Sequence, residues 1–213
     1  MSTPSACPLP PGSSAALDEE AARAELYGLL AQLYYAAPGA ALLSALRGAP
    51  TGAPQAGDCL QEPWQQLVDA ARALSDAAIA QEFAHLFGGV GKPALYLYGS
   101  HYLSGFLNEK PLARLRGDLD RMGLARAEAI PETEDHIACL CEAMRYLIAG
   151  DDPAVCTLGA QRNFFTTHLQ PWVRPLCDAL QAHPLAHFYC ALARFTRAFM
   201  AVETQGFEMF DGA

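Results

Sequence analysis

Apolar residues recur at helical spacing along this chain, and no segment alternates between apolar and polar residues as a half-buried strand does. Proline and glycine separate each apolar stripe from the next. One stripe, which falls on a single helix face, consists of Trp64, Leu67, Val68, Ala71 and Leu74. The pattern therefore predicts an all-α fold, a helical bundle of about nine to eleven helices joined by loops.

Residues 1–16 differ from the rest of the chain because they are rich in proline, serine and glycine, and they are predicted to form a flexible N-terminal arm. A helix is expected to begin near Asp18, since carboxylates are favoured at a helix N-terminus. The remaining residues are expected to form a single helical domain, 17–213, with a first half at about 17–124, a connector at 125–133 and a second half at about 134–213.

Several residues are typical of helix ends. Ser75 is predicted to cap one helix, and Ser100 is predicted to cap a short helix over residues 101–108. Pro111 fits the first turn of the helix that follows, and Gly123 is predicted to end that helix.

The charge of the chain argues against nucleic acid as a partner. Its 213 residues carry a formal net charge of −9, and the isoelectric point is near 5.0. Proteins that bind phosphate backbones use lysine and arginine, so an acidic chain suits a basic peptide better. The length is sufficient for a sizeable hydrophobic core.

The seven cysteines are predicted to be free thiols in a reducing compartment. The N-terminus lacks the basic start and apolar stretch of a secretory signal, and no apolar run is long enough to span a bilayer. We therefore expect a cytoplasmic protein with no stable membrane insertion.

No metal site, cofactor or catalytic constellation is predicted. Cys139 and Cys141 lack the second pair that structural zinc sites use, and Cys141 falls on an apolar stripe as a core residue would. The segment from Gly88 to Gly91 has no lysine and serine or threonine after it, so it does not fit a phosphate-binding loop. A small hydrolase or nucleotide-dependent enzyme that uses His136 or this glycine segment remains the alternative from another class.

The segment from Glu128 to Glu142 contains five carboxylates and neither lysine nor arginine. One interpretation is a helix N-terminus whose dipole favours negative charge. The other is an anionic docking patch for arginine or lysine side chains. The aromatic residues Tyr96, Tyr98, Tyr102 and Phe106 either belong to the core or line a groove for an apolar peptide.

Three segments taken together resemble the TorD/DmsD family of cytoplasmic chaperones, which serve molybdenum-cofactor oxidoreductases exported by the twin-arginine (Tat) route. The first runs from Gln81 to Gly89 and continues to Ser100-His101-Tyr102, the second is Glu132-Thr133-Glu134-Asp135-His136-Ile137, and the third is Phe164 to Trp172. The chain departs from the family pattern at Leu97 and Gly99, where family members often carry proline and glutamate.

The resemblance implies a TorD-like helical fold in two linked halves, present as a monomer or a domain-swapped homodimer. It implies a non-enzymatic chaperone that binds the Tat signal peptide and the apo form of a molybdenum-cofactor oxidoreductase and assists cofactor insertion before export. An assembly factor for a nitrate-reductase-type enzyme that is not exported is the alternative within the superfamily. The candidate signal-peptide-binding residues are Asp135, His136, Glu132, Glu134, Ser100, Tyr98, Tyr102, Phe106 and Tyr27.

Overall fold

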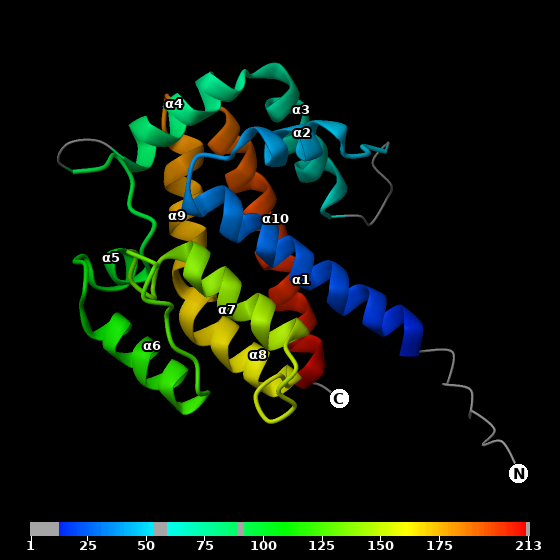
Figure 1. Cartoon of the computed structure of the whole chain (residues 1–213), viewed down its shortest axis with the longest axis vertical. Coiled ribbons are helices and arrows are strands. Elements are labelled where there is room, and N and C mark those ends of the chain that lie inside the picture. Colours follow the sequence, from blue (N-terminus) through cyan, green and yellow to red (C-terminus); the bar gives the residue numbers. More distant parts are fainter. Residues whose placement is uncertain (1–12, 53–58, 89–91, 212–213) are drawn as a thin grey trace, which may run out of the picture.

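The computed structural model of the chain describes residues 13–52, 59–88 and 92–211 (Figure 1). Within these ranges the regular elements are helices, and the single strand-like contact is an isolated antiparallel bridge between Tyr98 and His136. The predicted all-α fold is confirmed. None of the helices in this part of the chain combines the length and the hydropathy that crossing a membrane requires.

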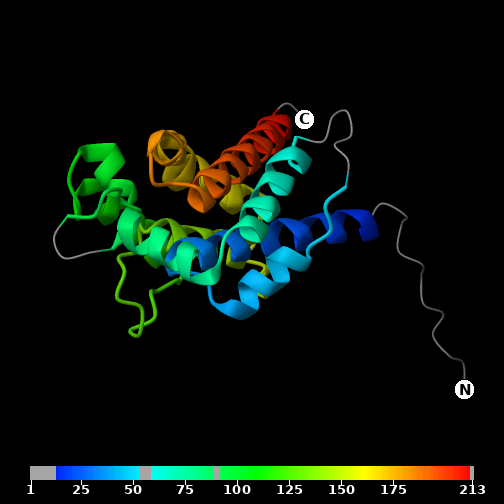
Figure 2. The same cartoon turned by 90° about the horizontal axis from the view of Figure 1, so that it is seen from above.

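The helices follow one another with short connections. In chain order they are α1 (Ser13–Tyr35), α2 (Ala40–Gly48), α3 (Gln61–Ala73), α4 (Asp76–Phe87), α5 (Gly99–Ser104), α6 (Lys110–Arg121), α7 (Ile137–Ala149), α8 (Leu158–Phe164), the π-helical turn η1 (Phe165–Leu169), α9 (Gln170–Ala182) and α10 (Phe188–Asp211). Figure 2 shows that the segment between α6 and α7 protrudes from the helix array.

Local side-chain chemistry explains several helix ends. The Ser75 hydroxyl accepts a hydrogen bond of 3.2 Å from the Ala78 amide, so the predicted cap of α4 is confirmed. Pro111 lies in the first turn of α6, and Gly123 follows that helix with a φ of +68°, a left-handed conformation that glycine adopts without steric cost. Both predictions for α6 are therefore confirmed.

One continuous core joins the two predicted halves of the sequence. α1 packs along α7, and α10 packs against α9 and α3 (Figures 1 and 2). The largest fully buried side chains come from α1, η1, α9 and α10 and from the helix before η1. They include Tyr27, Tyr34, Phe164, Phe165, Trp172, Tyr189 and Phe199.

A buried carboxylate ties α4 to the start of α10. Glu82 is 6% exposed, and its oxygens accept hydrogen bonds from the amides of His187 (2.9 Å), Phe188 (3.1 Å) and Tyr189 (2.8 Å). The first amides of a helix have no partner within the helix, so Glu82 caps α10 from another part of the chain. This contact explains why a glutamate precedes Phe83 in the first of the three segments that resemble the TorD/DmsD family.

A second buried carboxylate ties α1 to α10. Glu203 is 4% exposed and receives two hydrogen bonds of 2.8 Å from the Arg23 guanidinium. The Tyr27 hydroxyl donates to the same carboxylate at 3.0 Å. Because the charge is paired and hydrogen-bonded, its burial is compensated.

The structure also corrects three predictions about helices and adds one helix that was not predicted. α1 begins at Ser13, so it starts before the expected position near Asp18 and includes the end of the predicted arm. α2 was not predicted because only Leu43 and Leu46 are buried in it, too few for a periodic signal. α5 ends at Ser104, before the expected residue 108, because Gly105 turns the chain with a φ of +81°. Ser100 does not cap α5, since Tyr98 precedes the helix and the Ser100 side chain bonds elsewhere.

Some predictions concern residues that lie outside the described ranges. These are the rest of the flexible arm, residues 1–12, and the glycine-rich segment at residues 89–91.

Candidate functional site

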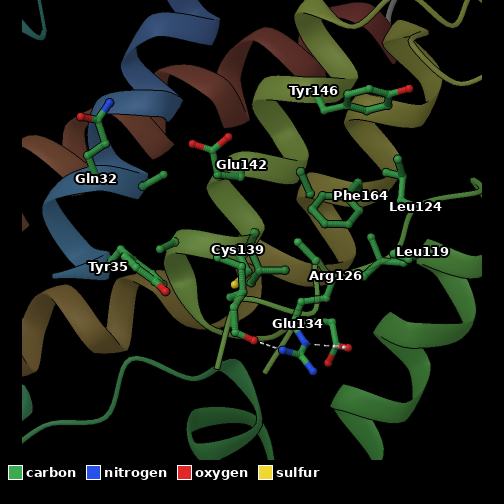
Figure 3. Close-up of a pocket in the computed structure, with 17 residues that line it drawn as sticks. Gln32, Tyr35, Leu119, Leu124, Arg126, Glu134, Cys139, Glu142, Tyr146 and Phe164 are labelled. Atoms are coloured by element: carbon green, nitrogen blue, oxygen red, sulfur yellow. Dashed lines mark hydrogen bonds and ion pairs between the residues drawn. The ribbon is translucent and has the colours of Figure 1, made fainter. Parts of the chain in front are cut away.

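An apolar pocket of about 470 Å³ lies between α1, α7 and the segment that follows α6 (Figure 3). Its floor includes Leu140 from α7 and Phe164 from α8, both of which are buried in the protein. Leu119 and Leu124 form one side, opposite Gln32 and Tyr35 of α1. The connector contributes the apolar side chains of Ala125, Ala127 and Ile130. Such a concave and mostly apolar surface is typical of binding sites.

Polar side chains stand around the mouth of this pocket. Glu142 and Tyr146 come from the exposed face of α7, and Glu134 comes from the turn before that helix. Tyr35 and Tyr146 are 39% and 37% exposed, so their rings are available to a ligand. The pocket therefore combines an apolar interior with a rim that contains two carboxylates.

Glu134 binds two guanidinium groups of the protein itself. Its carboxylate lies 2.9 Å from Arg116 of α6 and 3.6 Å from Arg126 of the connector. Burial opposes ionisation, but a hydrogen bond from the residue's own backbone and the two arginines lower the pKa of Glu134 below its ordinary value. The carboxylate is therefore ionised at neutral pH and faces a cationic partner.

Asp135 is 3% exposed and does not line the pocket. One carboxylate oxygen accepts from the Ser100 amide at 2.9 Å and from the Ser100 hydroxyl. The other oxygen accepts from the Thr133 hydroxyl at 2.6 Å, and the Asp135 carbonyl accepts from the Gly99 amide at 2.9 Å. Asp135 thus fixes the first turn of α5 to the chain that leads into α7.

His136 caps α7 and is 4% exposed. Its Nδ1 accepts a hydrogen bond of 3.2 Å from the Ala138 amide, an arrangement that requires Nδ1 to be unprotonated. Burial lowers the pKa of His136 to about 4, although Glu132 and Asp135 act in the opposite direction. The imidazole is consequently neutral at physiological pH, and His136 is not one of the residues that line the pocket.

Tyr98 and Glu132 complete this network. The Tyr98 hydroxyl donates to the Glu132 carboxylate, and the Tyr98 ring packs edge-on against His136 with centroids 5.0 Å apart. Burial, followed by the hydrogen bond to Glu132, raises the pKa of Tyr98. Five of the predicted residues, namely Ser100, Tyr98, Glu132, Asp135 and His136, therefore form one connected cluster beside the pocket.

Tyr102 belongs to the packing between α5 and α9. Its ring stacks on Trp172 with centroids 5.6 Å apart, and its hydroxyl donates to the Tyr96 carbonyl at 2.9 Å. Trp172 also explains the glycine at position 99, because a Cβ there would lie 2.9 Å from the Trp172 indole nitrogen. The departure from the family pattern at Gly99 thus accompanies a close approach between these two helices.

Two predicted residues lie away from the pocket. Phe106 is 70% exposed and lies in the loop between α5 and α6. Tyr27 is completely buried and bonds to Glu203, so its proposed contact with a peptide is corrected to a role in the core. Its burial depends on the packing of α1 along α7 and on Phe199 and Glu203 of α10.

The pocket residues of α1 and the pairing of Arg126 with Glu134 were not predicted from the sequence. Gln32 and Tyr35 are three positions apart on one exposed helix face, a spacing that many solvated faces share. The apolar residues of the connector were a weak signal, because loops between helices are usually polar. Contact between α1 and α7 is what brings these distant residues together.

The thiol in the pocket wall is not activated for catalysis. Burial raises the pKa of Cys139 to about 11, so the protonated form dominates at neutral pH. Cys141 is buried in the core as predicted. In the part of the chain that the structure describes, no three histidine, cysteine, aspartate or glutamate side chains are grouped as metal ligands.

The amino-acid sequence also matches proteins of known family. Residues 54–178, more than half of the chain, match the family described as nitrate reductase delta subunit. The chain belongs to this family. The TorD/DmsD resemblance is confirmed, because TorD-type chaperones are grouped with the nitrate reductase delta subunit family and the relatives below carry that name.

The curated relatives include proteins named "Chaperone protein TorD" from strains of Vibrio cholerae serotype O1. One is 28% identical over 148 residues, which cover 64% of this chain and 67% of the relative. Another is 27% identical over 129 residues, which cover 57% of this chain and 59% of the relative. The segment that matches the nitrate reductase delta subunit family includes the connector, α7 and every pocket residue except those of α1.

Proposed function

We propose that this chain is a chaperone for the maturation of a redox enzyme and that it binds the twin-arginine signal peptide of a molybdenum-cofactor oxidoreductase. The observation that carries the proposal is the apolar pocket between α1, α7 and the connector, with Glu134 and Glu142 at its mouth. The TorD chaperones among the relatives support the general role.

The chemistry of such a peptide complements the pocket. A signal peptide of this kind carries arginines next to an apolar stretch. The apolar stretch would occupy the pocket, since burial of apolar surface drives peptide association. The arginines would meet the carboxylates of the rim, because guanidinium and carboxylate groups form charge-assisted hydrogen bonds. The net charge of −9 favours approach of a basic peptide.

The structure supports different roles for the residues proposed from the sequence. Glu134 is the predicted carboxylate that faces the pocket, and Glu132 lies near it with the Tyr98 hydroxyl as its partner. Asp135, His136 and Ser100 have structural roles, because their hydrogen bonds fix the starts of α5 and α7. Phe106 offers exposed apolar surface that a longer client segment would contact.

The chaperone would act on the apo client in the cytoplasm, before export. By covering the signal peptide, it would delay export until the molybdenum cofactor has been inserted. No catalytic step is required of the chaperone itself. The capping role of His136 and the protonated thiol of Cys139 agree with this proposal.

Filling the pocket tests the proposal. Ala143 lines the pocket on α7, and Ala143→Trp should weaken binding of a fluorescent peptide with two arginines and an apolar segment by about tenfold or more. Ala149→Trp on the same helix is the matched control, because Ala149 is exposed and does not line the pocket. Equal affinities of both variants and the unchanged protein, measured by fluorescence anisotropy, would exclude this pocket as the binding site.

A second candidate function is favoured by the description of the matched family. The chain would then assist assembly of a nitrate-reductase-type enzyme that is not exported, and it would bind a segment of the mature client. Replacing both arginines of the test peptide by glutamine separates the candidates. Loss of affinity supports recognition of a twin-arginine signal, whereas unchanged affinity supports a client segment recognised by its apolar residues.

A further inference from the structure

Glu134 is occupied in this structure by arginines of the chain itself. Arg116 reaches it from α6 at 2.9 Å, and Arg126 reaches it from the connector at 3.6 Å. The Glu134 side chain is 15% exposed, whereas the side chains of Arg116 and Arg126 are 51% and 33% exposed. A carboxylate at the mouth of an apolar pocket thus already holds the type of group that the proposed peptide would bring.

Arg126 differs from Arg116 because it belongs to the pocket wall. Arg126 itself lines the pocket together with its neighbours Ala125 and Ala127. Its guanidinium also donates to the Ile130 carbonyl. Figure 3 shows Arg126 beside Glu134 at the pocket. The ion pair with Glu134 therefore ties this part of the connector to the pocket rim.

Apart from Arg126, the side-chain hydrogen bonds that the structure describes for the connector lie at its C-terminal end, where Glu132 accepts from Tyr98 and Thr133 donates to Asp135. The backbone hydrogen bonds described around the connector are local, from the Leu124 amide to the Leu119 carbonyl (2.9 Å), from the Ile130 amide to the Ala127 carbonyl (3.0 Å) and from the His136 amide to the Thr133 carbonyl (3.0 Å). Most of the connector side chains are exposed. Segments with few buried contacts and few long-range hydrogen bonds open at low free-energy cost.

We infer that Arg126 is an internal competitor for the client's arginine: in the free protein it occupies Glu134 and holds the connector against the pocket, and an arginine of the bound peptide replaces it. The inference rests on the proposed function, because it requires a peptide that carries arginine. Exchange of one guanidinium for another preserves the pairing of Glu134, so little electrostatic energy opposes it. A peptide without arginine has no means to release Arg126.

The competition lowers the apparent affinity by the fraction of protein in which the site is open. Removing the competitor should therefore tighten binding. For an ion pair of this exposure, we expect Arg126→Gln to bind the twin-arginine peptide about two to five times more tightly than the unchanged protein.

Arg121→Gln is the matched control. It makes the same chemical change and removes the same charge, so it has the same effect on general attraction of a basic peptide. Arg121 pairs with Asp118 on α6 and does not line the pocket, and Asp118 keeps a second partner in His168 at 2.8 Å. Circular dichroism and thermal unfolding of both full-length variants establish that each is folded.

The experiment titrates the unchanged protein and both variants with two fluorescent peptides, one with two arginines and one with glutamines in their place. The inference is supported if Arg126→Gln tightens binding of the arginine peptide alone and Arg121→Gln changes neither. It is overturned if Arg126→Gln has no effect, weakens binding, or tightens binding of both peptides equally. Failure of the unchanged protein and of both variants to bind either peptide would overturn the proposed function itself, and this inference with it.

Discussion

Glu134 and Asp135 are consecutive carboxylates with opposite environments. Asp135 is 3% exposed, and its carboxylate accepts hydrogen bonds from the Ser100 amide, the Ser100 hydroxyl and the Thr133 hydroxyl. Glu134 lies at the rim of the pocket, where its partners are guanidinium groups on exposed side chains. The donors of Asp135 are fixed in the fold, whereas those of Glu134 are exchangeable.

The difference separates residues that build the site from residues that can bind a partner. A buried carboxylate with a full set of neutral donors stabilises the fold, as Glu82 also does at the start of α10. A carboxylate that faces solvent and holds long, partly exposed arginines contributes little to stability and much to recognition. In the acidic segment, the buried Asp135 directly follows Glu134 of the pocket rim.

The largest effect is expected at Asp135. Asp135→Ala removes the acceptor of the Ser100 amide and hydroxyl and should lower the free energy of unfolding by about 2–4 kcal/mol. Urea denaturation monitored by circular dichroism measures the change. Asp120→Ala, at an exposed aspartate of α6, should change it by less than about 0.5 kcal/mol. Similar values for the two variants would contradict the framework role of Asp135.

His136 should make stability depend on pH. An unfolded histidine takes up a proton near pH 6.5, whereas folded His136 stays neutral down to about pH 4. The unfolded state therefore binds more protons in this window, and the free energy of unfolding falls as the pH falls through it. His136→Asn keeps a capping acceptor without a titrating group, so it should reduce this loss by about 2 kcal/mol.

The measurement compares urea denaturation of the unchanged protein and of His136→Asn at about pH 7 and about pH 4.5. Carboxylates titrate in both proteins, and their contribution cancels in the difference. Parallel pH profiles would show that His136 is not held neutral by the fold.

The smallest change in stability is expected at Glu134. Glu134→Gln should alter the free energy of unfolding by less than about 1 kcal/mol but weaken binding of the twin-arginine peptide by about two to five times. Glu208→Gln, at an exposed glutamate of α10 that does not line the pocket, provides the same change of charge as a control. A large loss of stability with unchanged affinity would place Glu134 in the framework beside Asp135.

The sequence was informative where a local interaction decides the outcome. Ser75 caps α4, Gly123 ends α6 and Cys141 lies in the core, because caps, left-handed turns and helical stripes depend on neighbouring residues. Serine is a common capping residue, but the Ser100 hydroxyl instead donates to the carboxylate of Asp135, 35 positions away.

Long-range packing explains what the sequence did not predict. The acidic segment was recognisable in the sequence. That Glu134 lies at the pocket rim while Asp135 is buried depends on the positions of α5 and α6. The contribution of α1 to the pocket likewise depends on its packing along α7. The arginine partners of Glu134 come from residues 116 and 126, outside the segment that contains only carboxylates.

The bonds from Glu82 to the start of α10 have a consequence for synthesis of the chain. They join residues 105 to 107 positions apart, so α4 can complete its contacts only after most of the polypeptide has left the ribosome. The apolar face of α1 likewise stays exposed until α7 and α10 have been synthesised and can cover it. A protein proposed to bind an incompletely folded client therefore passes through an incompletely folded stage itself. In this stage its first helices expose the surfaces that its last helix will bury.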